Sequence, residues 1–207
     1  MAYLGTQPND VKKNIGLYTP SEIIQLTKNG SWGGSLELIE DQTVSSEVSS
    51  VDFINLANNP FNVYLLQVSN IKTTATSQAR LRFSNDNGGS FISTGYEFAN
   101  FRLTTTGSSS NTLNTNHAQI NTNLLSDATT SMSANGYFYL YDLLDSNKFS
   151  STNYQVMAQY SSDARTSFGG GNLPTAEVHN AVTIMPSSGN ISSATMKLFG
   201  VKEIWVI

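Results

Sequence analysis

Residues 61–71 decide the fold class, and they read Phe61-Asn62-Val63-Tyr64-Leu65-Leu66-Gln67-Val68-Ser69-Asn70-Ile71. Side chains alternate between the two faces of an extended strand, so odd-numbered and even-numbered residues form separate faces. One face carries Phe61, Val63 and Leu65, and the other carries Tyr64, Leu66 and Val68. Both faces are apolar in the middle of the stretch, which is typical of a central strand of a β-sandwich.

Alternation with a period of two continues from residue 35 through most of the chain. Short alternating runs, separated by turns rich in Asn, Gly and Ser, predict roughly eight to ten strands. No amphipathic helical pattern lies between these runs, which argues against a parallel α/β fold. The sequence therefore predicts an all-β protein, an antiparallel β-sandwich of jelly-roll-like character, over residues 35–207.

Several polar segments interrupt this pattern. Residues 72–78, 106–116 and 163–173 are rich in Gly, Ser, Thr and Asn and are predicted to be surface loops. The glycine run within residues 168–172 lacks a following Lys-Ser/Thr pair, so we expect a flexible loop and not a phosphate cradle. Residues 117–125 fit neither the strand period nor the helix period, and both structures stay open for them.

Residues 1–34 are predicted to form an extended N-terminal arm that carries at most a short helix. Thr19 can cap that helix, with Pro20 at its first position and Glu22 three residues after the cap. Residues 28–30, Lys-Asn-Gly, then supply a stop signal.

The composition narrows the function classes. Only 13% of the residues are charged, the net charge is -4, and Ser, Thr and Asn together make up about a third of the chain. A surface with so little charge repels itself weakly, which favours assembly. The eleven Lys and Arg residues are scattered, so we expect no nucleic-acid binding. No apolar run is long enough to insert into a membrane.

No set of residues has the spacing of a catalytic, metal or cofactor site, so we expect a protein that is not an enzyme and needs no cofactor. His117 and His179 are 62 positions apart and are predicted to be surface or loop residues. The candidate carboxylates show no diagnostic spacing for glycoside hydrolysis; they are Asp52, Asp86, Glu97, Asp142, Asp145 and Glu177. Asp142 and Asp145 follow a strand and are interpreted as residues of a solvated turn.

Residues 84–91 match the Asp-box form S-x-D-x-G-x-[ST]-[WF] through Ser84, Asp86, Gly88 and Phe91. Asp86 can accept hydrogen bonds from turn amides, Gly88 can take a positive φ, and Phe91 is expected to reach the core. Asp boxes are structural hairpins in sialidases, and the single copy here predicts a structural hairpin away from any active site. Calcium binding is the weaker alternative, because the spacing of an EF-hand is absent.

Residues 137–141 alternate between tyrosines and other apolar residues. Tyr137, Tyr139 and Tyr141 should share one face of a strand, opposite Phe138 and Leu140. Tyrosine is enriched at protein interfaces, so we expect this face to contact a neighbouring subunit. Stacking on the sugar rings of a host surface glycan is the alternative.

Four stretches carry a resemblance to virion proteins of tailed bacteriophages. Ala2-Tyr3-Leu4-Gly5-Thr6-Gln7-Pro8 resembles the short N-terminal tag of fibre-like and other virion proteins, notably those of marine podoviruses. Residues 61–71, followed by Arg80-Leu81-Arg82-Phe83-Ser84 and the Asp box, resemble a β-sandwich domain of tail-fibre and virion structural proteins. Residues 188–201 resemble the closing strand-turn-strand of that domain. Residues 11–40 depart from the usual pattern, which leaves the position on the particle open.

The resemblance implies a structural protein located in the virion, on the tail or the capsid surface, in the tail-fibre or receptor-binding class. Its partners would be other virion proteins and further copies of the chain, with a trimer as the first guess. The arm would anchor the chain through Tyr3, Leu4, Pro8 and Trp32, because an arm that becomes ordered must bury apolar groups. Two alternatives stay open: a head-decorating or tail-associated protein without receptor binding, and a carbohydrate-binding module.

Overall fold

The computed structural model describes residues 19–28, 35–126, 133–160 and 163–202. The chain divides into two compact units, Met1–Ser35 and Leu36–Ile207. In the first unit, helix α1 (Pro20–Lys28) begins and ends where the sequence predicts. Its cap is reciprocal: the Glu22 N–H donates to Thr19 Oγ1 (3.3 Å), and the Thr19 N–H donates to Glu22 Oε2 (2.7 Å). No helix among the described residues is long and apolar enough to cross a membrane.

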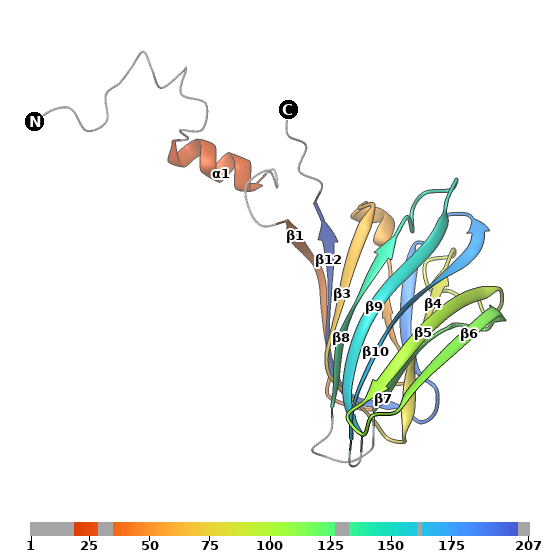
Figure 1. Cartoon of the computed structure of the whole chain (residues 1–207). Coiled ribbons are helices and arrows are strands. Elements are labelled where there is room, and N and C mark those ends of the chain that lie inside the picture. The colour runs from red at the N-terminus through yellow and green to blue at the C-terminus, as the bar shows by residue number, and fades with distance from the viewer. Residues whose placement is uncertain (1–18, 29–34, 127–132, 161–162, 203–207) are drawn as a thin grey trace, which may run out of the picture. The chain divides into compact units, whose positions relative to one another are not determined.

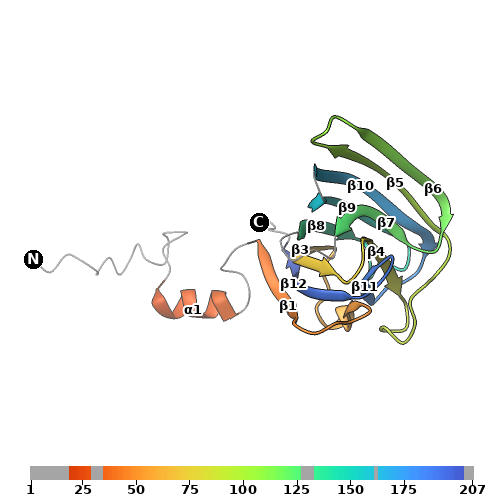
Figure 2. The ribbon, with the colours of Figure 1, turned by 90° about the horizontal axis from the view of Figure 1, so that it is seen from below.

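The second unit is an antiparallel β-sandwich, which confirms the predicted fold class (Figures 1 and 2). The larger sheet has eight strands, in the order β1 (Leu36–Val44), β12 (Ile191–Val201), β3 (Val63–Thr73), β8 (Ala134–Tyr141), β9 (Phe149–Tyr160), β10 (Asp163–Ala176), β5 (Tyr96–Thr104) and β6 (Ser109–His117). The smaller sheet has four, in the order β2 (Val51–Phe53), β11 (Ala181–Pro186), β4 (Ser77–Ser84) and β7 (Ile120–Ser126). A short 3-10 helix, η1 (Leu56–Asn58), follows β2.

The core lies between the two sheets and is filled by every second side chain of the central strands. On β3, Tyr64, Leu66 and Val68 are buried, as the alternation predicts. Strand β4 faces them from the smaller sheet with the buried side chains of Leu81 and Phe83. Other fully buried large side chains include Phe53, Leu56, Tyr96, Ile120, Phe138, Leu140, Leu143, Ile184, Ile191, Met196 and Leu198.

Buried tyrosine hydroxyls join one sheet to the other. The Phe83 N–H of β4 donates to the Tyr96 hydroxyl of β5 across the core (2.7 Å). The Tyr154 hydroxyl of β9 donates to the Asn121 carbonyl of β7 (3.0 Å). Burial raises the pKa of Tyr96 to about 12, so this hydroxyl stays protonated at any physiological pH. The first bond supplies the partner of the buried Phe83 N–H, and the second shares the Asn121 carbonyl with Asn100 Nδ2.

Two of the predicted loops are strands. Residues 109–117 form β6, and residues 163–176 form β10, which pairs with β5 on one side and β9 on the other. Their Ser, Thr, Asn and Gly content hid them, because no row of apolar residues marks a strand face. The glycine run is a close-packing feature of β10 and not a flexible loop: a Cβ atom on Gly171 would lie 2.6 Å from the Glu97 carbonyl oxygen. Of the ambiguous residues 117–125, residue 117 ends β6 and residues 120–125 belong to β7.

Replacing Tyr96 by Phe should leave the buried Phe83 N–H without its partner. An unpaired buried donor costs about 1–3 kcal/mol, so the free energy of unfolding should fall by that amount. Tyr137→Phe, which removes an exposed hydroxyl, is the matched control and should change it by less than about 0.5 kcal/mol. Urea unfolding followed by circular dichroism measures both variants. Equal losses would contradict the assigned role of Tyr96.

Candidate binding surface

The outer face of the eight-stranded sheet carries the predicted tyrosine row. Phe138 and Leu140 of β8 are fully buried in the core, whereas Tyr137, Tyr139 and Tyr141 point to the outer side. The division of β8 into two faces is therefore confirmed. Tyr137 meets Tyr139 edge to face with ring centroids 5.7 Å apart, and Tyr139 stacks on Tyr141 at 6.3 Å. The three rings form a continuous aromatic row along the strand.

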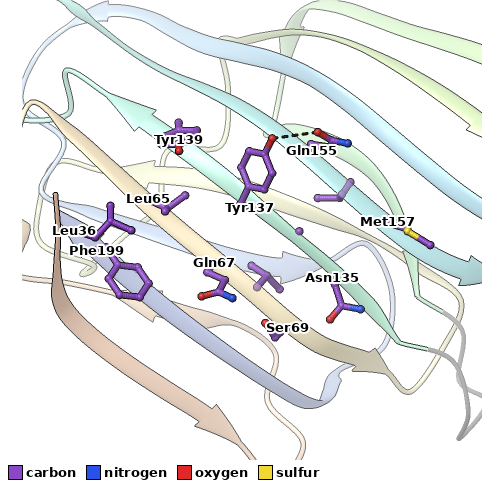
Figure 3. A pocket seen from close by; sticks show the side chains of 13 residues that line it. Leu36, Leu65, Gln67, Ser69, Asn135, Tyr137, Tyr139, Gln155, Met157 and Phe199 are labelled. Atoms are coloured by element: carbon purple, nitrogen blue, oxygen red, sulfur yellow. Dashed lines mark hydrogen bonds between the residues drawn. The ribbon is translucent and has the colours of Figure 1, made fainter. Parts of the chain in front are cut away.

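A hollow of about 600 Å³ lies on this face, which we call the tyrosine trough (Figure 3). Strands β3, β8 and β9 form its floor, and their register sets its side chains in rows across the sheet. One row places Gln67 beside Tyr137 and Gln155, and the next places Leu65 beside Tyr139. The trough is lined by Leu36, Leu65, Gln67, Val68, Ser69, Asn135, Gly136, Tyr137, Tyr139, Gln155, Val156, Met157 and Phe199.

The polar groups of the trough are neutral. Its lining contains amides, a serine and two phenols, but no Asp, Glu, Lys, Arg or His. The Tyr137 hydroxyl donates to Gln155 Oε1 at 3.1 Å, which holds the ring upright at the rim. Lys197 lies next to Gln67 in the register, but its ammonium group forms an ion pair with Asp41 at 3.2 Å. A molecule that enters the trough would therefore contact aromatic, aliphatic and amide groups and no charged side chain of the lining.

Large apolar side chains on this face remain open to solvent. Tyr137 is 39% exposed and Met157 is 59% exposed, although both lie on strands in the interior of the sheet. A contiguous exposed patch of this kind usually marks a contact with another molecule. The lining holds the Ser69, Tyr137 and Tyr139 hydroxyls but no carboxylate, histidine or lysine, and its aromatic, aliphatic and amide groups have the composition of a binding surface.

Sequence reasoning missed most of the trough. The trough residues Gln67, Asn135, Gln155, Met157 and Phe199 come from β3, β8, β9 and β12, of which only β8 and β9 are neighbours in the sequence, so strand pairing brings the set together. The sequence contains one indication of the trough, because residues 61–71 are apolar on both faces of the strand. The face of β3 opposite the core forms part of the trough floor.

The Asp-box residues form a tight turn after β4. Ser84 Oγ accepts from the Gly88 N–H (2.9 Å) and donates to Asp86 Oδ1 (2.7 Å). Asp86 also accepts from the N–H and the hydroxyl of Ser90, at 2.8 and 2.7 Å. The Ser90 and Ser84 hydroxyls hold the pKa of the Asp86 carboxyl at about 2. Gly88 has a φ of 88°, as expected for this turn.

Two details of the Asp-box prediction differ from the structure. The turn joins β4 to β5, which lie in different sheets, so it is not a hairpin. Phe91 is only half-buried and lies beside Gly88, and the core position is taken by Phe83 instead. The turn ties neighbouring loops together, because the Asn87 N–H donates to Asn180 Oδ1 at 2.7 Å.

His179 lies in the loop between β10 and β11, which is one of the two predicted positions, but it is fully buried there and not at the surface. Its Nδ1 lies 2.7 Å from Ser150 Oγ, and its Nε2 lies 3.3 Å from Glu177 Oε1. These three residue types also occur in hydrolase triads, but Ser150 is itself fully buried and out of reach of a substrate. Burial lowers the pKa of His179, and the Glu177 carboxylate opposes that shift only in part. The imidazole therefore serves as a neutral core group.

The remaining candidates are dispersed. Asp142 and Asp145 lie in a turn, as predicted, and both form ion pairs with Lys148 at 3.0 and 3.4 Å. They border a separate hollow of about 370 Å³. No group of three or more metal-ligating side chains occurs among the described residues. The anchoring residues Tyr3, Leu4, Pro8 and Trp32 lie outside the described residues.

Comparison with protein-family models, curated proteins and solved structures gave no match.

Acid should destabilise the sandwich through His179. Its pKa in the folded chain lies below the ordinary value of 6.5, so the unfolded chain binds the proton more tightly. The free energy of unfolding should therefore fall as the pH is lowered from 7 to 5. His179→Gln should show a flatter dependence over this range, measured by urea unfolding at each pH. His117→Gln is the control and should keep the wild-type slope; a flat wild-type profile would contradict the assignment.

Proposed function

We propose that this chain is a non-enzymatic structural protein of a tailed-phage particle, in the tail-fibre or receptor-binding class. The proposal joins the sequence resemblance of residues 2–8, 61–71, 80–91 and 188–201 to the character of the sandwich. Residues 1–34 would attach the chain to another virion protein. The sandwich would be presented at the surface of the particle as part of a symmetric homo-oligomer.

The tyrosine trough is the observation that carries this proposal. Tyr137, Tyr139 and Tyr141 are the residues through which we expect a neighbouring subunit to bind. Aromatic residues with Met at the centre and few charges are the composition of a protein interface core. The trough lies on the exposed side of the sheet, and its lining holds no charge that a second subunit would have to neutralise. Covering it would bury rings that are already held in place by Gln155 and by one another.

A second candidate function is supported by the same surface. Gln67, Asn135 and Gln155 place amide groups beside the Tyr137 ring, and rings flanked by neutral hydrogen-bonding groups also suit a neutral sugar. The chain would then contact a host surface glycan directly. Binding of the full chain to a glycan array, abolished by Tyr137→Asp, would favour this function. Silence on the array favours the subunit interface.

The position on the particle separates the receptor-binding class from a head-decorating or tail-associated protein. Antibodies against the chain, imaged by immunogold electron microscopy of whole phage particles, should label the tail tip or fibres. Label on the head would favour the decorating role. A chain that lacks residues 1–34 should fail to enter particles, and its incorporation at the wild-type level would contradict the anchoring role of the arm.

A charge placed in the trough should weaken subunit association. Tyr137→Asp would bury an unpaired carboxylate against apolar groups, and we expect the dissociation constant to rise at least about tenfold. Val178→Asp is the matched control, since Val178 is an apolar residue of similar exposure that does not line the trough. Light scattering over a dilution series measures both. A wild-type monomer at micromolar concentration would contradict the proposal.

A further inference from the structure

Strand β6 forms one edge of the eight-stranded sheet and, among the described residues, pairs on one side only, with β5 (Figure 1). An edge strand presents backbone N–H and C=O groups to which another strand can add. Soluble proteins usually blunt such edges with charges, prolines, bulges or short length. The two sheets of this sandwich have four edge strands, β1, β6, β2 and β7, and these differ in such protection.

The other three edges each carry a protective feature. Strand β1 contains three acidic residues and a register shift between Leu38 and Glu40. Strand β2 has only three residues. On β7, the Asn121 carbonyl accepts hydrogen bonds from Asn100 Nδ2 (2.9 Å) and from the Tyr154 hydroxyl (3.0 Å), so the larger sheet covers this edge.

Strand β6 is neither short nor charged, and its register shift is confined to its end, beyond Asn114. It has nine residues, Ser-Ser-Asn-Thr-Leu-Asn-Thr-Asn-His, without Pro, Asp, Glu, Lys or Arg. Its register against β5 is regular from Ser109 to Asn114, and the shift comes only beyond that point. The strand therefore offers a straight, uncharged edge over six consecutive residues, which is the length of many complete strands.

The hydrogen-bond pattern identifies which groups face outward. The Thr104 N–H donates to the Ser108 carbonyl directly opposite it (3.0 Å). Bonded and non-bonded pairs alternate along an antiparallel ladder. Residues 109, 111 and 113 are opposite 103, 101 and 99, which are the non-bonded positions. Their N–H and C=O groups therefore point away from β5, toward the open edge.

An apolar patch on the outer face borders this edge. It consists of Phe101 and Leu103 on β5, Leu113 on β6 and Phe168 on β10, and we call it the edge patch. Leu113 is 68% exposed, more than any other large apolar side chain among the described residues. Phe101 and Phe168 contact each other with ring centroids 5.8 Å apart. The patch thus extends to the last strand of the sheet and stops at an unpaired backbone.

We infer that β6 pairs antiparallel with β6 of a second copy of this chain, so that the two eight-stranded sheets become continuous. A two-fold axis perpendicular to the sheet would keep both outer faces on one side and join the two edge patches into a single apolar strip. Because β6 is uncharged, no like charges meet when it pairs with itself. This inference goes beyond the proposed function: it concerns a sheet edge away from the trough and holds for the isolated chain.

Light scattering of the purified full chain and its variants tests the inference. Asn111→Pro removes an outward N–H without breaking a bond to β5, and Leu113→Lys places a charge in the strip. Leu38→Lys is the matched control, because Leu38 is 52% exposed on the same face of the opposite edge strand. Circular dichroism and a thermal melt confirm that each variant is folded. The wild-type mass should be twice that of the two β6 variants and equal to that of Leu38→Lys.

The measured masses distinguish the β6 edge pairing from the trough interface. If the trough interface fails, the wild type is a dimer and the β6 variants are monomers. If the trough interface holds, the β6 variants keep an oligomer of half the wild-type mass. Identical masses for the wild type and both β6 variants would overturn the edge pairing. Dissociation by Tyr137→Asp alone, with the β6 variants unchanged, would also overturn it while supporting the proposed function.

Discussion

Side chains alternate between the two faces of a β-strand, and this alternation decides which residues of the sandwich lie in the core and which lie on its outer face. Once Phe138 and Leu140 are placed in the core, the neighbouring Tyr137, Tyr139 and Tyr141 must point to the opposite side of the sheet. The same rule operates on β3, whose outer side chains contribute to the trough floor. The smaller sheet covers only the inner face of the larger one, so the chain leaves a broad apolar surface for a partner.

The charged side chains of the larger sheet lie on some of its strands and are absent from others. The β1 edge carries two ion pairs, Asp41 with Lys197 and Glu37 with Lys202, while β5 carries Glu97 and Arg102 and β10 carries the Asp163–Arg165 ion pair. The trough in the middle has no charge in its lining, and β6 at the far edge has none either. Charge blocks pairing at one edge of the sheet while the centre and the other edge stay open to neutral contacts.

Predictions from the sequence succeeded where apolar residues alternate and failed where the strands are polar. The faces of residues 61–71 and 137–141 follow from the period alone. Strands β6 and β10 were mistaken for loops, because Ser, Thr, Asn and Gly mark turns as often as they mark a polar strand. His179 was predicted to be a surface or loop residue, and its burial was missed, since nothing in its neighbours indicates that Ser150, 29 positions away, would pair with its ring in the core.

The sequence by itself determined the all-β class, the capped helix α1, the Asp-box turn and the direction of each tyrosine on β8, because these depend on neighbours within a few residues. Tertiary structure decided which strands lie side by side, and hence the rows that set Gln67 and Gln155 on either side of Tyr137. It also decided that β6 ends the sheet. Strand order depends on contacts between residues far apart in the chain. A local pattern of side chains does not specify which distant strand will complete its hydrogen bonds.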